Sequence, residues 1–248
     1  PYGKLVALGA VAEFYAANPD LKREYDAHGL HVIGSNGGTA YDLFCNKPVA
    51  SLADAKGTQT RTANQAVAKE VESMGFSPVS VAANEIYEAF TRGIIKCVYL
   101  FPSGYETQLA DVPGDKYWIH LDLSGWMNNL HIFNKAKWDA MPPLARQIMT
   151  DGYVRYLALD ATSTYNNTRK FGQRIKDGRI KAVEPDRDLL DALHAHQEKV
   201  IAEMVAAAPP GVDDPQGAID QFVGLIEKWR RIVSDELNLP GLNTHPIS

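Results

Sequence analysis

The chain has 248 residues, which is long enough for one large domain or two smaller ones with their own cores. Apolar residues make up 45% and charged residues 22%, the usual balance of a globular protein. A formal net charge of -5 without a basic stripe argues against binding to nucleic acid or to an anionic lipid surface. No apolar run approaches the roughly 20 residues that cross a bilayer, so we expect no direct membrane insertion.

Helix and strand signals alternate through the first hundred residues. Asn64 and Asn84 are typical N-caps, and Gly75 and Gly93 are typical of a helix end. In chain order we expect a helix at 10–17, a short helix capped by Asp20, strands at 30–33 and 39–45, a helical turn at 51–54, a strand at 58–62, a helix at 65–73, a strand at 79–81, a helix at 85–92 and a strand at 94–101. This alternation predicts an α/β fold with a largely parallel sheet.

The remainder of the chain is expected to be mostly helical. Strands are predicted at 117–123 and 128–133, and helices at 144 towards 171, 187–207 and 219–233. The first of these helices follows Pro142-Pro143 and keeps its apolar residues at helical spacing for several turns. A helix of that length can bridge two lobes.

Familiar catalytic and metal-binding motifs are absent from the sequence. The seven histidines form no His-Glu-x-x-His arrangement, and no carboxylate cluster completes a metal site. A nucleophile elbow, a phosphate-binding loop and a dinucleotide fingerprint are also missing. We therefore predict no catalytic residue, no metal and no cofactor, although catalytic residues drawn from distant segments would leave no local trace.

Two cysteines, Cys45 and Cys97, are too few for a disulfide framework or a cysteine-rich metal site. Both fall in strand-like segments. We favour the interpretation that they are two small buried thiols. Pairing in an oxidising compartment is the alternative that the sequence leaves open.

Arg61 is the residue with the clearest potential for ligand binding. It lies at the end of a short predicted strand, just before the helix that Asn64 caps. Ligand sites of α/β folds occur where strands end and helices begin. A guanidinium there could hold a carboxylate through two parallel hydrogen bonds, helped by the free N–H groups of the helix. The alternative is a solvated or salt-bridged surface arginine.

Several segments around Arg61 resemble one family of binding proteins. Asn46-Lys47-Pro48, residues 51–54 (SLAD), Gly57 and Arg61 are similar to the "kkPi-s-l-D-lkG-lkiR" segment of the solute-binding proteins of TRAP transporters, the DctP-like group. The later segments MGFSPV at 74–79, EIYEAFTRG at 85–93 and WDAMP at 138–142 follow in the family's order. The resemblance spans nearly the whole chain.

This resemblance implies a periplasmic-binding-protein-like fold, with two α/β lobes that hinge strands and a long helix connect. Residues 1–46 would be the remainder of lobe 1 running into the hinge, 47–120 mainly lobe 2, and 121–248 the hinge return, the bridging helix and the C-terminal helices. It also implies a chain that starts late, after an earlier part of lobe 1 and a signal peptide. The expected function is capture of a small organic acid in the periplasm for the membrane subunits of a TRAP transporter, without catalysis.

By the same resemblance, Arg61 corresponds to the arginine that holds the ligand carboxylate. Some members have a second arginine where this chain has Tyr41, and many have asparagine and proline where it has Leu100-Phe101. Aromatic side chains would then surround a single carboxylate anchor, which suits an aromatic or branched monocarboxylate. The predicted ligand-binding residues are Arg61, Tyr41, Tyr99, Phe101, Trp126, Asn64 and Asn128. Core packing is the alternative role for Tyr99 and Trp126, and helix capping is the alternative role for Asn64.

Two rival functions remain open at this point. An enzyme with a similar two-lobed architecture would turn over the acid that it binds. A ligand-sensing domain of a receptor or regulator would bind the acid with the same fold but would be fused to a signalling segment.

Overall fold

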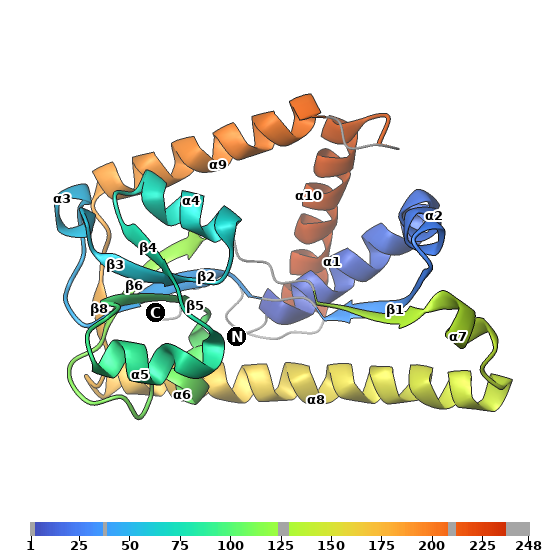
Figure 1. Ribbon diagram of the computed structural model, residues 1–248, viewed down its shortest axis with the longest axis horizontal. Coiled ribbons are helices and arrows are strands. Elements are labelled where there is room, and N and C mark those ends of the chain that lie inside the picture. Colours follow the sequence, from blue (N-terminus) through green and yellow to red (C-terminus); the bar gives the residue numbers. More distant parts are fainter. Residues whose placement is uncertain (1–2, 37–38, 124–128, 208–211, 237–248) are drawn as a thin grey trace.

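The computed structural model describes residues 3–36, 39–123, 129–207 and 212–236 (Figure 1). Its elements form two α/β bodies, one built on a six-stranded sheet and the other on a two-stranded sheet. Among the helices of these residues, none combines the length and the apolar character that crossing a bilayer requires. The predicted two-lobed α/β fold is confirmed.

The larger sheet is mixed. Its strands, in spatial order, are β4 (Ser77–Ser80), β3 (Gln59–Thr62), β5 (Cys97–Leu100), β2 (Tyr41–Cys45), β6 (Tyr117–Leu123) and β8 (Lys181–Val183). β3 is parallel to β4 and β5, and β6 is parallel to β8, whereas β2 is antiparallel to β5 and β6. The prediction of a largely parallel sheet is therefore wrong at its centre. β2 enters the sheet from the smaller body and runs away from it. β3, β4 and β5, which crossover helices connect, run back towards the smaller body and are therefore antiparallel to β2.

Helices cover both faces of this sheet, because its strands carry apolar side chains on each side. The helices on the first face are α4 (Gln65–Ser73) and α9 (Arg187–Ala207), and those on the second are α5 (Ile86–Thr91), α6 (Pro102–Gln108) and the last turns of α8 (Pro143–Lys176). Leu43 and Tyr99 belong to the first core, and Phe44, Trp118 and Phe171 to the second. Burial of each large side chain contributes about 1.5–3 kcal/mol.

The second body is smaller and mostly helical. Its elements are α1 (Gly3–Ala17), α2 (Pro19–Ala27), β1 (Leu30–Asn36), β7 (Asn129–Asn134), α7 (Lys135–Asp139) and α10 (Pro215–Arg231), which continues as a π-helical turn (Ile232–Glu236). α1 and α10 pack closely, since a side chain at Gly9 would overlap the ring of Trp229. Glu13 fixes the pair by accepting hydrogen bonds from Lys228 Nζ at 2.6 Å and Trp229 Nε1 at 3.0 Å.

The helix α8 runs along both bodies, as Figure 1 shows. Its 34 residues span about 50 Å at 1.5 Å per residue. Near its middle, Tyr153 Oη donates to the carbonyl of Ser35 in the smaller body at 2.8 Å. Near its end, Arg174 donates to Glu106 of α6 at 2.7 Å and 3.2 Å. The predicted long bridging helix is confirmed.

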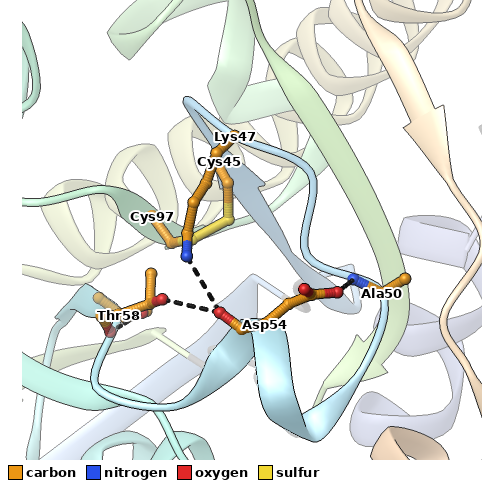
Figure 2. Close-up of a disulfide and its surroundings, with 7 residues drawn as sticks. Cys45, Lys47, Ala50, Asp54, Thr58 and Cys97 are labelled. Carbon is orange, nitrogen blue, oxygen red and sulfur yellow. Dashed lines mark hydrogen bonds between the residues drawn. A yellow bond between two sulfur atoms is a disulfide. The ribbon is translucent and has the colours of Figure 1, made fainter.

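The segment that carries the family resemblance folds as a capped helical turn, α3 (Leu52–Ala55). Ser51 Oγ accepts from the backbone N–H of Asp54, and the Asp54 carboxylate accepts from the N–H groups of Ser51 and Ala50. Lys47 Nζ donates to the Asp54 carbonyl at 3.0 Å (Figure 2). These hydrogen bonds to the carboxylate lower the pKa of Asp54.

Cys45 and Cys97 form a disulfide (Figure 2). They lie directly opposite each other on the antiparallel strands β2 and β5, and both are fully buried. The favoured interpretation of two free thiols is therefore wrong. Strand-like periodicity identified both segments, but it carries no information about which strands are neighbours.

Other differences concern the ends of elements. α9 matches its predicted bounds and α4 is capped by Asn64 as predicted. Asn84 is not an N-cap, because it lies inside a 3-10 turn (Ala83–Glu85) that precedes α5. The short strand β8 and helix α6 were not predicted, since three and seven residues are too few for a clear apolar period.

Candidate functional site

One edge of the six-stranded sheet, the edge formed by strand ends and not by an outer strand, faces the smaller body. The register brings together at this edge the ends of β3, β4 and β5 and the start of β2, which carry Thr62, Ser80, Leu100 and Tyr41. Helix α4 begins here, directly after β3. The carboxyl ends of parallel strands beside a helix N-terminus are the usual ligand site of α/β folds.

Arg61 lies at this edge and is buried, with 8% of its surface exposed. Its Nε donates to the carbonyl of Val81, which follows β4, at 3.0 Å. Across the described parts of the chain, no carboxylate lies within ion-pair distance of its guanidinium, and the Nη groups donate no hydrogen bond. Burial lowers the pKa of Arg61, but an arginine remains charged at any physiological pH.

Tyr41 and Phe101 form an aromatic group with Tyr99 at the same edge. The Tyr41 ring stacks on Tyr99 with 4.8 Å between ring centroids, and it meets Phe101 edge-on at 5.2 Å. Burial raises the pKa of Tyr41, so its hydroxyl stays neutral and can donate a hydrogen bond. Three of the predicted ligand-binding residues are thus brought together, and one of them, Tyr41, lies close enough to Arg61 for an electrostatic interaction.

Tyr99 is enclosed in the core, with 1% of its surface exposed. Its hydroxyl donates to the buried carboxylate of Glu70 on α4 at 3.2 Å. Burial is the main reason why the pKa of Tyr99 rises far above its ordinary value. In this position the Tyr99 ring packs against the Tyr41 ring and holds it in place.

The polar residues predicted for the site have different positions. Asn64 is exposed, and its side-chain oxygen accepts from the N–H of Val67 at 3.0 Å as the cap of α4. Trp126 and Asn128 lie outside the described residues.

A groove of about 700 Å³ opens between α4 and α9. It begins near the same edge of the sheet, at Gln65 and Asp122, and continues along α9. Its lining is part apolar and part charged, and consists of Gln65, Ala66, Lys69, Glu70, Asp122, His196, Gln197, Val200, Ile201, Glu203 and Met204. Arg61 and Tyr41 are outside this groove.

Asp42 anchors the point where β2 and β6 leave the large sheet, and sequence reasoning missed this role. Its buried carboxylate accepts from Trp118 Nε1 at 2.8 Å and from the backbone N–H groups of Leu121 and Asp122. His120 Nδ1 lies 3.1 Å from the same carboxylate. The one available signal was a carboxylate inside an otherwise apolar strand.

Asp42, His120 and Asp122 also offer ligand atoms within 4.8 Å of one another. Both oxygens of Asp42 already accept hydrogen bonds from the protein. Asp122 has a left-handed backbone, with φ of 47°, at the end of β6. We therefore interpret the group as a structural anchor of the hinge.

This anchor predicts a pH dependence of stability. Burial disfavours the charged form of His120, but the hydrogen bond and charge of Asp42, and the charges of Asp122 and Glu184, outweigh it and raise the pKa above 6.5. A raised pKa in the folded state gives stability that is present below the unfolded pKa and is lost as the pH rises through the folded pKa. The unfolding free energy of wild type relative to His120→Gln should therefore be larger at about pH 6 than at about pH 8.5. Denaturant titrations at both pH values test this, and a difference that grows with pH would contradict it.

Comparisons with known proteins agree with this architecture. The family model of bacterial extracellular solute-binding proteins, family 7 (DctP), matches residues 8–208. A curated solute-binding protein of Sulfitobacter sp. (strain NAS-14.1) is 24% identical over 90 residues, which is 36% of this chain and only 25% of that relative.

Solved structures of TRAP-transporter binding proteins share the fold. The ectoine-binding protein of the TeaABC TRAP transporter from Halomonas elongata superposes with a TM-score of 0.70 at 18% identity, covering 92% of this chain and 74% of that one. DctP7 of Bordetella pertussis, which binds pyroglutamic acid, gives 0.70 at 21% identity, with 88% and 71% covered. A binding protein of Bordetella bronchiseptica with bound mandelate gives 0.70 at 18% identity, with 91% and 75% covered. Since the family model covers most of its length, the chain belongs to family 7 of the bacterial extracellular solute-binding proteins, the DctP family.

Proposed function

We propose that this chain is the extracytoplasmic solute-binding protein of a TRAP transporter and that Arg61 holds the carboxylate of its ligand. The observation that carries the proposal is a largely buried arginine whose Nη groups remain accessible and have no acidic partner in the described chain. A cation set in a packed wall without a counter-ion is only partly compensated by solvent. A ligand carboxylate that accepts two parallel hydrogen bonds from the Nη groups would supply that counter-ion.

Capture in this proposal needs no covalent chemistry. The ligand enters between the two bodies, and closure around the hinge expels water from the cleft. The ion pair with Arg61 becomes stronger as the local dielectric falls. Tyr41 and Phe101 would bury the apolar part of the acid beside it. The closed form binds the ligand better, so the ligand shifts the equilibrium towards the shape that the membrane subunits recognise.

The ligand class follows from the surroundings of Arg61. A single cationic anchor beside aromatic rings suits a small monocarboxylate that carries a ring or a branched chain. Structural neighbours are described as binding pyroglutamic acid, orotic acid and mandelate, which are ring-bearing carboxylic acids. The Cys45–Cys97 disulfide supports a periplasmic location, because disulfides persist in oxidising compartments.

Binding should be visible as a rise in melting temperature with carboxylates. Mandelate, pyroglutamate and phenylacetate form the test panel, and mandelamide is the matched neutral control. An acid at about 100 times its Kd adds about 2.7 kcal/mol, which raises Tm by roughly 5 °C or more. A panel in which no acid stabilises the protein, or in which the amide is equally effective, would refute the proposal. Conversion of the bound acid, measured by mass spectrometry, would instead favour an enzyme.

A further inference from the structure

The end of β1 carries buried polar atoms without hydrogen-bond partners. Four such side-chain atoms occur in the described part of the chain, and three of them belong to Ser35 (Oγ), Asn36 (Oδ1) and His131 (Nε2). The strand register pairs His131 with Gly34 and Asn129 with Asn36, so the side chains of His131 and Asn36 share one face of the two strands and the Ser35 side chain lies on the other. The fourth atom, Gln108 Oε1, belongs to α6 in the other body.

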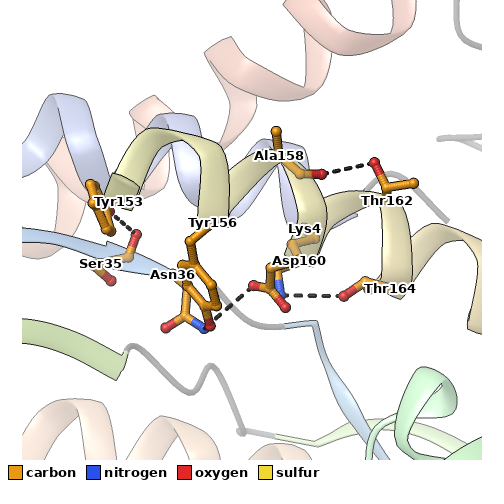
Figure 3. A network of polar contacts seen from close by, with 9 residues as sticks. All are labelled: Lys4, Ser35, Asn36, Tyr153, Tyr156, Ala158, Asp160, Thr162 and Thr164. Atoms are coloured by element: carbon orange, nitrogen blue, oxygen red, sulfur yellow. Dashed lines mark hydrogen bonds and ion pairs between the residues drawn. The ribbon is translucent and has the colours of Figure 1, made fainter. Parts of the chain in front are cut away.

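Two tyrosines of α8 connect these residues into one cluster (Figure 3). Tyr156 Oη accepts from Asn36 Nδ2 at 3.0 Å, and Tyr153 Oη donates to the Ser35 carbonyl at 2.8 Å. The His131 ring lies 5.1 Å from the Tyr153 ring and 5.0 Å from the Tyr156 ring. The cluster is therefore a packed unit between β1, β7 and α8.

The orientation of the Asn36 amide is determined by its neighbours. Besides Tyr156, its NH₂ group faces a carboxylate oxygen of Asp160 at 3.4 Å, and a carboxylate only accepts. Asp160 is held in turn by an ion pair with the buried Lys4 of α1. Asn36 Oδ1 consequently points away from α8 (Figure 3). Only 8% of Asn36 is exposed, so leaving this acceptor unpaired is unfavourable.

A short segment of the chain links the cluster to the proposed carboxylate site. Asn36 ends β1 and Tyr41 begins β2, so at most about 18 Å of chain separates them. Arg61 is opposite Val98 in the register, and Val98 belongs to the core on the face that α8 covers. Arg61 and Asn36 thus both lie on the α8 side of the cleft.

We propose that Asn36 and His131 form a second polar subsite of the cleft, in which Asn36 Oδ1 accepts a hydrogen bond from an O–H or N–H group of the ligand. This inference rests on the proposed function and refines its ligand class. A hydroxy acid or a lactam acid would satisfy the buried acceptor, and an acid without a donor would leave it unpaired. A site built to bind a donor discriminates strongly against analogues that lack it.

Matched acids measure this preference. Mandelate and phenylacetate differ by one hydroxyl group, and pyroglutamate and cyclopentanecarboxylate differ by the lactam group. By isothermal titration calorimetry, wild type should bind the donor-bearing acid of a pair at least about 10-fold more tightly. Asn36→Leu should reduce that ratio to about 2-fold or less while phenylacetate still binds. His131→Phe is a milder second variant and should reduce the ratio partly, whereas Ser35→Ala, on the other face of β1, should keep it. Gln108→Leu, which removes the unpaired atom outside the cluster, should keep the wild-type ratio.

The outcomes separate this inference from the proposed function. A ratio that persists in folded Asn36→Leu and His131→Phe protein overturns the subsite and leaves the carboxylate anchor intact. Equal binding of both acids by wild type overturns it as well. If wild type binds none of the four acids, the proposed function and the subsite fail together. A ratio that is lost equally in Gln108→Leu would show a general effect of packing and would also overturn the subsite.

Discussion

Replacement of Arg61 by alanine should weaken carboxylate binding by about 100-fold or more. The guanidinium lies at the cleft-facing edge, and its Nη groups make no hydrogen bond to the described residues. Removal of one partner of a desolvated charge pair leaves the ligand carboxylate buried without compensation. Isothermal titration calorimetry with the best acid of the panel measures the loss.

Two further variants make this result specific. Arg61→Lys keeps the charge but cannot form two parallel hydrogen bonds, so we expect an intermediate loss of about 10-fold. Arg92→Ala, at an exposed arginine paired with Glu88 on the neighbouring helix α5, should bind like wild type. The ligand-free Arg61→Ala protein should be about as stable as wild type, because the substitution removes a charge that has no acidic partner among the described residues. Affinity that stays within a few-fold of wild type would exclude Arg61 as the anchor.

Loss of the Cys45–Cys97 disulfide should destabilise the protein by about 4 kcal/mol. The bond joins residues 52 positions apart, and closing a loop of that length lowers the conformational entropy of the unfolded chain. For a chain of this size, the change corresponds to a fall in Tm of roughly 10 °C. The double variant Cys45→Ala/Cys97→Ala, compared with wild type under non-reducing conditions, tests this by denaturant and thermal unfolding.

Reduction provides the matched control for the disulfide. Wild type unfolded in the presence of dithiothreitol should approach the stability of the double variant, and the double variant should not respond to the reductant. Since both sulfurs are fully buried, reduction should be slow in the folded protein. Two free thiols in unfolded, unreduced wild type would contradict the disulfide.

The sequence alone predicted the features that depend on neighbouring residues in the chain. Helix α9 has its predicted bounds, and Asn64 caps α4, because apolar period and capping chemistry act within a few residues. The long helix α8 was predicted for the same reason, whereas the two-lobed architecture followed from the family resemblance. The position of Arg61 near the end of β3 was also predicted from the neighbouring residues.

The pairing of distant segments was decided only by the tertiary structure. The antiparallel course of β2, the Cys45–Cys97 disulfide and the hydrogen bonds of Asp42 all join residues far apart in the chain, and no local period encodes such neighbours. The same holds for the site. Sequence could nominate Arg61 as a carboxylate anchor, but its burial without an acidic partner and the unpaired oxygen of Asn36 arise from packing between separate elements. Local chemistry determined which residues could bind an acid, and the fold determined which of them are buried and unpaired.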